Sequence, residues 1–224
     1  FSFLVGAALP FSLAARAGRG QSRSAMIGHA FRRALVLVVL GIFLRSLGHP
    51  QTRFTFEDTL TQIGLGYGFL FILGLRPRRD QWIALAVILV VFWAAFALYP
   101  VPGPDFAWES VGVQADWPHL MTGFEAHWNK GENFSAQFDR WFLNLFPREK
   151  AFVFNEGGYQ TLSFIPTLGT MILGLIAGRM LRAESPRVPL RWLLVTGAAL
   201  VAAGVVLHVA GINPVVKKVW TPAW

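Results

Sequence analysis

The sequence predicts an all-α, polytopic transmembrane helical bundle, and three observations support this fold class. Of its 224 residues, 54% are hydrophobic and only 14% are charged, which is too apolar for an ordinary soluble domain. Several uncharged runs approach the roughly 20 residues that a membrane-spanning helix needs. Basic residues are concentrated in alternate connections between these runs. An all-α membrane domain explains the three together.

Six hydrophobic segments can be placed along the chain by their apolar runs. The clearest is 82–99, which is apolar throughout and would measure about 27 Å as a helix. The sequence opens on "FSFLVGAALP" without a methionine or a preceding basic region. We therefore interpret it as an excerpt of a longer protein, and its first segment as the end of a helix rather than a signal peptide. The six segments are 1–15, 30–48, 59–75, 82–99, 159–181 and 192–211.

The first, third and fifth connections, 16–33, 76–79 and 179–191, hold most of the basic residues. Only two acids, Asp80 and Glu184, lie in or beside them. Because Lys and Arg mark the cytoplasmic side of membrane proteins, we expect these three connections to be cytoplasmic. The net charge of +8 is then a consequence of membrane topology, and no nucleic-acid partner is expected.

The second segment is the weakest of the six, because only 34–44 is uncharged, about 16 Å as a helix. Arg33 and Arg45 are therefore predicted near opposite membrane interfaces. For Arg45 two interpretations stay open. Its side chain can snorkel to the interface, or it can pair within the membrane with Glu57 or Asp58.

The fourth connection, 100–158, is much longer than the others and is predicted to be an ordered extracytoplasmic loop. Within it, five apolar residues recur at helical spacing, which predicts a short helix with Ser135 as its N-cap and Pro147 beyond its end. This helix either lies in the outer interface or packs over the bundle, and the loop could roof a pocket. The five residues are Phe138, Trp141, Phe142, Leu145 and Phe146.

A polar stretch, Asn155-Glu156-Gly157-Gly158, stands directly before the fifth apolar segment. The N-terminus of a helix carries a partial positive charge, and glycines let backbone N–H groups approach a ligand. Glu156 could orient or deprotonate such a ligand. Four hydroxyl residues follow, and they either bond back to helix carbonyls or line a polar channel. They are Thr161, Ser163, Thr167 and Thr170.

Glycines are frequent within the apolar segments. Gly174 and Gly178 have the G-x-x-x-G spacing, which favours close helix–helix packing in lipid, with a backbone opening for a ligand as the alternative. The chain has no cysteine, which excludes thiolate chemistry. Its five histidines lack metal-type spacing with carboxylates, so no metal is expected.

Five stretches, in this order, carry a resemblance to a known family: "FLVGAALPFSLAAR", "RRALVLVVLGIFLRS", "FEDTLTQIGLGYGFLF", "NEGGYQTLSFIPTLGTMILGLIAGR" and "GINPVVKKVWTPAW". The sequence resembles bacterial membrane proteins of the heparan-α-glucosaminide N-acetyltransferase type, the DUF5009 domain family. The resemblance implies one transmembrane acyltransferase domain over 1–224, in the bacterial inner membrane. It would take an acetyl group from cytoplasmic acetyl-CoA, the co-substrate, and pass it to an amino sugar or related glycan outside.

The resemblance also bears on individual residues. The essential histidine of the family lies just before the helix with which this sequence begins, so no histidine of this chain takes that role. Gln62 stands where relatives often have an arginine, and Val216 where they usually have an asparagine. Glu156 and one of the two following glycines match the entrance of the lysosomal enzyme, and Lys217 matches the pattern near the end.

From these residues we expect Glu156 as the candidate catalytic group. Arg179 is expected to contact CoA phosphates at the inner face, unless it is only one of the basic residues that set topology. The expected partners are the lipid bilayer, the acyl donor and the glycan acceptor, and homo-oligomerisation stays open. A transporter or flippase for a glycan or lipid precursor is the alternative function. The residues expected to border the acceptor pocket are Glu57, Asp58, Gln62, Asn155, Gly157 and Gly158.

Overall fold

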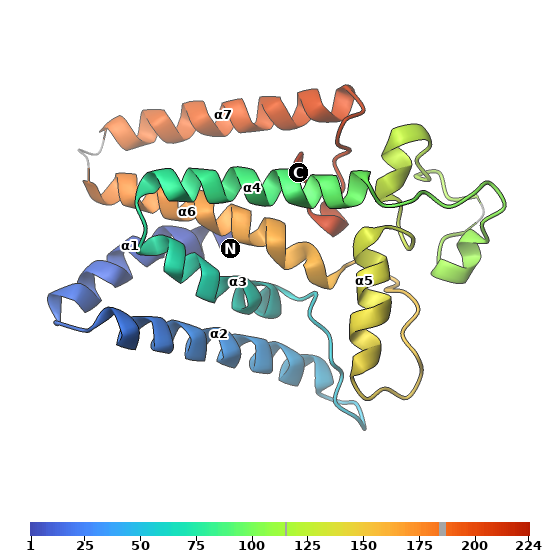
Figure 1. The fold of residues 1–224 in the computed structure, drawn as a ribbon, viewed down its shortest axis with the longest axis horizontal. Coiled ribbons are helices and arrows are strands. Elements are labelled where there is room, and N and C mark those ends of the chain that lie inside the picture. The colour runs from blue at the N-terminus through green and yellow to red at the C-terminus, as the bar shows by residue number, and fades with distance from the viewer. Residues whose placement is uncertain (115, 184–186) are drawn as a thin grey trace.

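A computed structural model describes residues 1–114, 116–183 and 187–224. It is helical, and no strand occurs in the described residues (Figure 1). The α-helices are joined by short connections and by one long segment that carries short 3₁₀ turns. The α-helices are α1 (Ser2–Gly18), α2 (Arg23–Ser46), α3 (Thr59–Gly74), α4 (Arg78–Ala97), α5 (Phe134–Phe142), α6 (Phe164–Ala183) and α7 (Arg187–Val209).

Each of the six predicted apolar segments contains a helix, but only four are long and apolar enough to cross a membrane. These are Arg23–Ser46, Arg78–Ala97, Thr161–Arg182 and Leu190–Val209. The other two, α1 and α3, have 17 and 16 residues. At 1.5 Å per residue, α3 covers only about 24 Å. The chain is therefore a helical membrane protein in which four spans, rather than six, are supported by length and composition.

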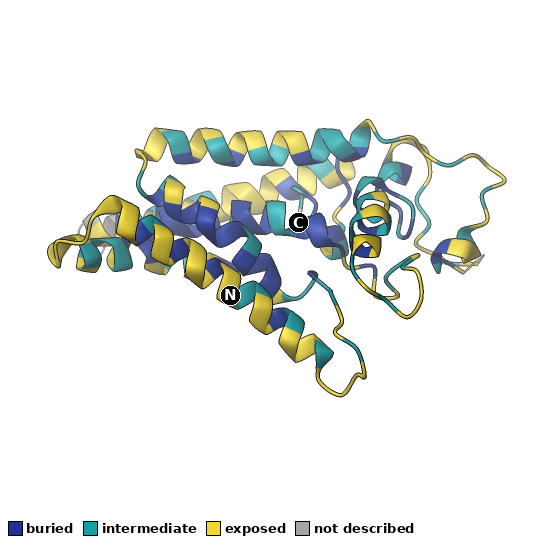
Figure 2. Ribbon diagram, turned by 60° about the horizontal axis from the view of Figure 1, so that its bottom comes forward, coloured by how far each residue is buried: buried dark blue, intermediate teal, exposed yellow. Residues whose placement is uncertain are grey.

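Helix α6 is the centre of the bundle, and it packs against α1, α3 and α4 (Figure 1). Its residues Met171, Ile172, Leu175 and Ile176 are fully buried. In contrast, α2 and α7 leave most of their apolar side chains exposed, as the outer faces in Figure 2 show. Such apolar outer faces suit helices surrounded by lipid.

Glycines bring α1 and α6 into backbone contact. A Cβ atom added at Gly174 would lie 2.0 Å from the carbonyl oxygen of Phe3, and one at Gly178 would lie 2.2 Å from that of Ala7. From the other side, a Cβ atom at Gly6 would lie 1.8 Å from the carbonyl oxygen of Met171. No side chain fits at these positions, so the prediction that the G-x-x-x-G spacing serves close helix packing is confirmed.

The connections divide between the two ends of the bundle (Figure 1). The α1–α2 and α3–α4 turns and the C-terminal end of α6 lie together at what we call the basic end. Residues 100–158 lie at the opposite, loop end. Of the fifth connection, Glu184 to Pro186 lie outside the described residues, whereas Arg179 and Arg182 are part of α6. The predicted sorting of basic loops to one end is thus present in the described part of the chain.

The short helix in the long loop, α5, begins one turn earlier than predicted. Its N-cap is Asn133, whose side-chain oxygen accepts a hydrogen bond from the backbone N–H of Ala136 at 2.9 Å, and Ser135 is buried without a capping role. Asn133 is suited to this position because its side-chain amide also donates to the carbonyl of Asn129 at 2.8 Å.

The apolar face of this region packs over the bundle and also remains partly exposed. The ring of Phe142 lies 5.3 Å from that of Phe56, and Phe146 lies 4.8 Å from Phe54. Trp141 is 61% exposed on the same stretch. Both predicted interpretations, packing over the bundle and an exposed apolar surface, therefore hold for different residues.

The prediction that Arg33 lies near an interface is wrong. Helix α2 already begins at Arg23, and the guanidinium carbon of Arg33 lies 5.3 Å from the ring centre of Tyr67, midway along α3. Arg45 lies in the last turn of α2 and is exposed. No ion pair joins it to Glu57 or Asp58 in the described residues, because the Asp58 carboxylate instead caps α3.

After α7 the chain folds back along the bundle. The indole N–H of Trp93 on α4 donates to the carbonyl of Ile212 at 2.9 Å. Further on, the carbonyl oxygen of Ala223 lies 2.5 Å from where a Cβ atom of Gly204 would stand, so the tail crosses α7 closely. Residues 212–224 are therefore held between α4 and α7.

Candidate functional site: two cavities at opposite ends of the bundle

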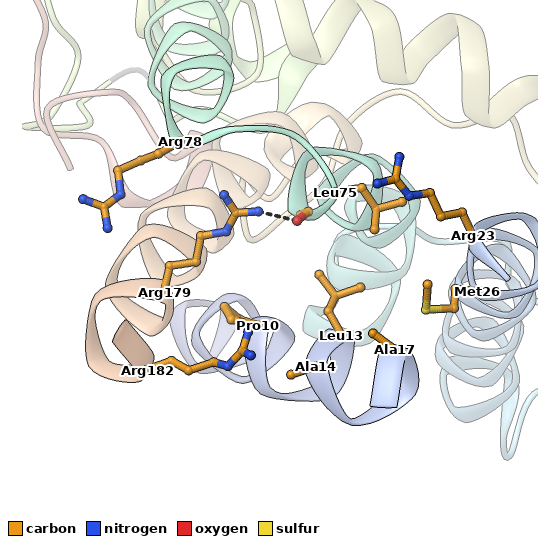
Figure 3. Close-up of a pocket in the computed structure, with 11 residues that line it drawn as sticks. Pro10, Leu13, Ala14, Ala17, Arg23, Met26, Leu75, Arg78, Arg179 and Arg182 are labelled. Carbon is orange, nitrogen blue, oxygen red and sulfur yellow. Dashed lines mark hydrogen bonds between the residues drawn. The ribbon is translucent and has the colours of Figure 1, made fainter. Parts of the chain in front are cut away.

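A cavity of about 730 Å³ lies at the basic end, between α1, α2, α3, α4 and α6. Four arginines from three helices surround it, and Figure 3 shows their side chains around the opening. No carboxylate lines it. We call it the arginine cavity; its lining comprises Pro10, Leu13, Ala14, Ala17, Arg23, Met26, Gly74, Leu75, Arg78, Arg179 and Arg182.

Arg179, the residue expected to bind a cofactor, is one of these four arginines. Its guanidinium group donates a hydrogen bond to the carbonyl of Gly74 at the end of α3 (Figure 3). This bond fixes one nitrogen of the group and leaves others for a ligand. Several guanidinium groups around one opening are suited to phosphates, because each offers a planar pair of donors to anionic oxygens.

A second cavity of about 670 Å³ lies at the loop end. Its walls come from the long loop, from the polar stretch before α6 and from the returning tail. We call it the lysine cavity, and its polar lining includes His119, Asn129, Lys130, Glu156, Lys217 and Lys218, with Trp117 and Trp128 among the apolar groups. Glu156 is the one acidic residue in this lining.

The turn that presents Glu156 depends on its glycines. The backbone N–H of Gly158 donates to the carbonyl of Asn155 at 2.9 Å, and the Asn155 side-chain oxygen accepts from the N–H of Tyr159 at 3.2 Å. Gly158 has φ = +74°, a conformation that favours glycine. Asn155 therefore shapes the turn, while Glu156, Gly157 and Gly158 line the lysine cavity.

The lysines at this end rest on aromatic rings. The Nζ atom of Lys130 lies 4.7 Å from the ring centre of Trp117, and that of Lys218 lies 3.8 Å from the ring centre of Tyr159. The side-chain hydrogen bond from Lys218, and its positive charge, lower the pKa of Tyr159. Cation–π contacts of this kind hold ammonium groups in place without neutralising them.

The structure does not bring Gln62 into the lysine cavity, so the expectation that it borders the acceptor site with Glu156 is not supported. Gln62 is 5% exposed, and its amide donates to the carbonyls of Phe56, Gln160 and Thr161 at 2.9 to 3.3 Å. Its side-chain oxygen accepts from the Thr167 hydroxyl at 3.4 Å. Gln62 is thus fully used in joining α3 to the start of α6.

Glu57 and Asp58 also lie away from the lysine cavity. The Asp58 carboxylate accepts from the backbone N–H groups of Leu60 and Thr61 at 2.9 and 3.2 Å, so it caps α3. Glu57 lies at the same helix start, close enough to Asp139 to raise the pKa of that carboxyl. The physical reason for both misplacements is the same: polar groups before a helix satisfy its free N–H groups first.

The four hydroxyls of the segment leading into and along α6 line neither cavity. Thr170 bonds back to the carbonyl of Pro166 at 3.4 Å, as one of the two interpretations predicted. Thr167 bonds to Gln62, and Ser163 donates to the carbonyl of Lys218 at 3.5 Å. These groups hold the bundle together rather than lining a channel into either cavity.

Sequence reasoning missed Asp139, which is 3% exposed on α5. Its carboxylate accepts the backbone N–H of Thr161 at 3.0 and 3.3 Å. Burial raises its pKa to about 6. The signal was present in its position, since Asp139 directly follows Phe138 on the side of α5 that faces the bundle.

Sequence reasoning also missed most of the cavity linings. Arg23, Arg78 and Arg182 were counted only as topology residues, and Lys130 and Lys218 were not singled out. Lys217 was expected on the outward side and lines the lysine cavity. Among the described residues no group of three His, Asp or Glu side chains is placed to hold a metal ion. No protein-family model matches the chain, and a search of curated proteins found no match.

Proposed function

We propose that this chain is the membrane domain of an acyltransferase that moves an acetyl or other acyl group from cytoplasmic acyl-CoA to an amino sugar or related glycan outside. One observation carries the proposal: a single bundle has a cavity at each end, of similar size and different chemistry. The resemblance of five stretches to the heparan-α-glucosaminide N-acetyltransferase type supports the choice of reaction.

In this proposal all six apolar helices lie in the bilayer, with the shorter α1 and α3 enclosed by longer neighbours. The basic end faces the cytoplasm, because arginine-rich connections remain there. Residues 16–33, 76–79 and 179–191 are then cytoplasmic, and the lysine cavity opens outside the bacterial inner membrane.

The arginine cavity is the proposed donor site. CoA carries a diphosphate and a further phosphate, and Arg23, Arg78, Arg179 and Arg182 supply guanidinium groups from α2, α4 and α6 around one opening. The volume of about 730 Å³ is within the range of cavities that hold ligands of nucleotide size.

The lysine cavity is the proposed acceptor site. The amine nitrogen attacks the thioester carbonyl carbon, a C–N bond forms and the C–S bond breaks, and the CoA thiolate leaves. Glu156 orients the amine and takes its proton, which is general-base catalysis. Because Phe164 and Arg179 are separated by about 22 Å along α6, the acyl group must cross that length of the bundle.

Incubation of the purified full-length protein with labelled acetyl-CoA and a panel of amino sugars tests the proposal. We expect label on an amino sugar, and we expect Glu156→Gln to abolish transfer while membrane expression stays intact. Glu109→Gln, at an exposed glutamate outside both cavities, is the matched control. Unchanged turnover in Glu156→Gln would remove Glu156 from the site.

Cavities at both ends of one bundle also suit a transporter or flippase for a glycan or lipid precursor, the second candidate. Liposomes containing the protein distinguish the two. Movement of a labelled glycan lipid across the bilayer without any acyl-CoA, together with no acetyl transfer, would favour transport and reject the transferase.

A further inference from the structure

Arg33 lies at mid-depth in the helical bundle. It is the eleventh of the 24 residues of α2, and its guanidinium carbon lies 5.3 Å from the ring centre of Tyr67, the ninth of the 16 residues of α3. By helical rise, Tyr67 is about 12 Å from the loop end of α3 and about 10 Å from its basic end. A guanidinium group stacked there is within the hydrocarbon layer rather than at either interface.

Arg33 forms no hydrogen bond or ion pair with any of the described residues. Its single polar neighbour there is the face of the Tyr67 ring. A charged side chain at this depth is costly, and membrane proteins pair such charges with opposite ones. Neighbouring hydroxyls offer hydrogen bonds but no negative charge.

A cavity of about 260 Å³ adjoins Arg33 between α1 and α2. Because α1 packs on α6 and α2 packs on α3, these two helices diverge from their short turn (Figure 1). The lining is apolar along α1 and polar on the opposite side, where Arg33 and Tyr67 lie. We call it the lateral groove; it is lined by Phe1, Leu4, Val5, Ala8, Leu9, Ser12, Arg33 and Tyr67.

A second copy of this chain cannot supply the missing negative charge. Of the six apolar helices, only α4 contains an acidic residue. That residue, Asp80, lies in the first turn of α4 and is paired with Arg76 at 3.0 Å. A carboxylate at the depth of Arg33 must therefore come from outside these 224 residues.

We propose that the lateral groove binds an apolar transmembrane helix that carries one Asp or Glu near its middle and is contributed from outside these 224 residues. Its carboxylate pairs with Arg33 and can accept a hydrogen bond from the Tyr67 hydroxyl. Its apolar side chains pack on Leu4 and Val5 of α1. The inference is independent of the acyltransferase proposal, since it concerns the side of the bundle rather than the two end cavities.

Fluorescence transfer in liposomes tests this inference. The chain has no cysteine, so Leu4→Cys can carry the only dye on the protein. The probes are two labelled apolar helical peptides of about 23 residues, identical except for a central Glu or Gln. We expect the Glu peptide to bind about tenfold more tightly than the Gln peptide, the range of polar contacts between membrane helices.

Substitutions identify the residue responsible for the preference. Arg33→Ala should abolish the difference between the two peptides, and Arg33→Glu should shift the preference to a peptide with a central Lys. Arg32→Ala is the matched control, because Arg32 is an adjacent exposed arginine outside the groove lining. It should keep the preference for Glu.

Three outcomes would overturn the proposal. The first is equal binding of the Glu and Gln peptides to the unchanged protein. The second is a Glu preference that survives Arg33→Ala. The third is self-association through the labelled groove, seen as transfer between two copies that the Glu peptide does not displace.

Discussion

The carboxylate of Asp139 on α5 accepts the backbone N–H of Thr161 at 3.0 Å, and so joins the long loop to the start of α6. Both groups are buried, and they come from segments separated by an entire turn of the loop. Because the lysine cavity is built from this loop and from the residues just before Thr161, the bond helps to fix the shape of the cavity.

We predict that this carboxylate makes stability depend on pH. Burial raises the pKa of Asp139 from its ordinary 3.8 to about 6, so the folded protein holds a proton that the unfolded chain has lost. Stability from this group is therefore present below pH 3.8 and is lost as the pH rises to 6. The pKa difference of roughly two units corresponds to about 3 kcal/mol.

Thermal unfolding of the wild type and of Asp139→Asn across pH 4 to 7 measures this effect. Asparagine is neutral throughout and can still accept from Thr161, so the variant should gain stability relative to the wild type as the pH rises. A difference between the two proteins that stays constant across this range would contradict the assignment.

Substitution of the glycines at the α1–α6 contact should destabilise the bundle. Gly174→Ala places a Cβ atom 2.0 Å from a carbonyl oxygen of α1, and the helices must separate, at a cost of about 1–3 kcal/mol or more. Gly197→Ala on α7 is the control, because nothing lies within 4 Å of its added Cβ atom. Melting temperatures in detergent should fall for the first variant and stay the same or rise for the second.

The arginine cavity should discriminate among acyl donors by their phosphates. Arg182→Gln should raise the KM for acetyl-CoA about tenfold or more, since a lost charged hydrogen bond costs about 1.5–3 kcal/mol. Acetyl-pantetheine, which has no nucleotide phosphates, should be used equally well by wild type and variant. Arg19→Gln, at an exposed arginine beside the cavity, is the control. An equal loss with both donors would mean that Arg182 does not contact phosphate.

The tyrosines report on the lysine cavity by their titration. The hydrogen bond and charge of Lys218 lower the pKa of Tyr159, whereas burial raises the pKa of Tyr99. In absorbance titrations of the wild type, Tyr159 should therefore ionise at lower pH than Tyr99. Lys218→Gln should move the earlier transition to higher pH, and Tyr159→Phe should remove it. An unchanged first transition in Lys218→Gln would show that the lysine does not lie over the ring.

The helices could be predicted from the sequence wherever an apolar run was long and uninterrupted. The segment 82–99 is largely α4, and the spacing of Gly174 and Gly178 predicted the contact that these glycines make. The depth of Arg33 could not be predicted, because a window that counts charges ends the membrane segment at the first arginine. In the structure α2 continues through that arginine, whose guanidinium group rests on Tyr67.

The candidate site was predicted only in part, for a different reason. Glu156, Gly157 and Gly158 line one cavity and Arg179 lines the other, as the local sequence suggested. The partners of these residues come from helix ends and from a tail that meet only after folding. Asp58 and Gln62 illustrate the opposite error, since their hydrogen bonds to nearby backbone groups cannot be read from residue type.

The tail that folds back from α7 makes the extracellular chamber sensitive to its solvent. Lys217 and Lys218 belong to a strip of chain attached at one side to Trp93 and at the other to Gly204, on the helix with the fewest protein neighbours. Lipids with shorter or longer tails tilt such a helix, and we expect the strip to be displaced with it. Substrate preference would then follow the thickness of the host membrane.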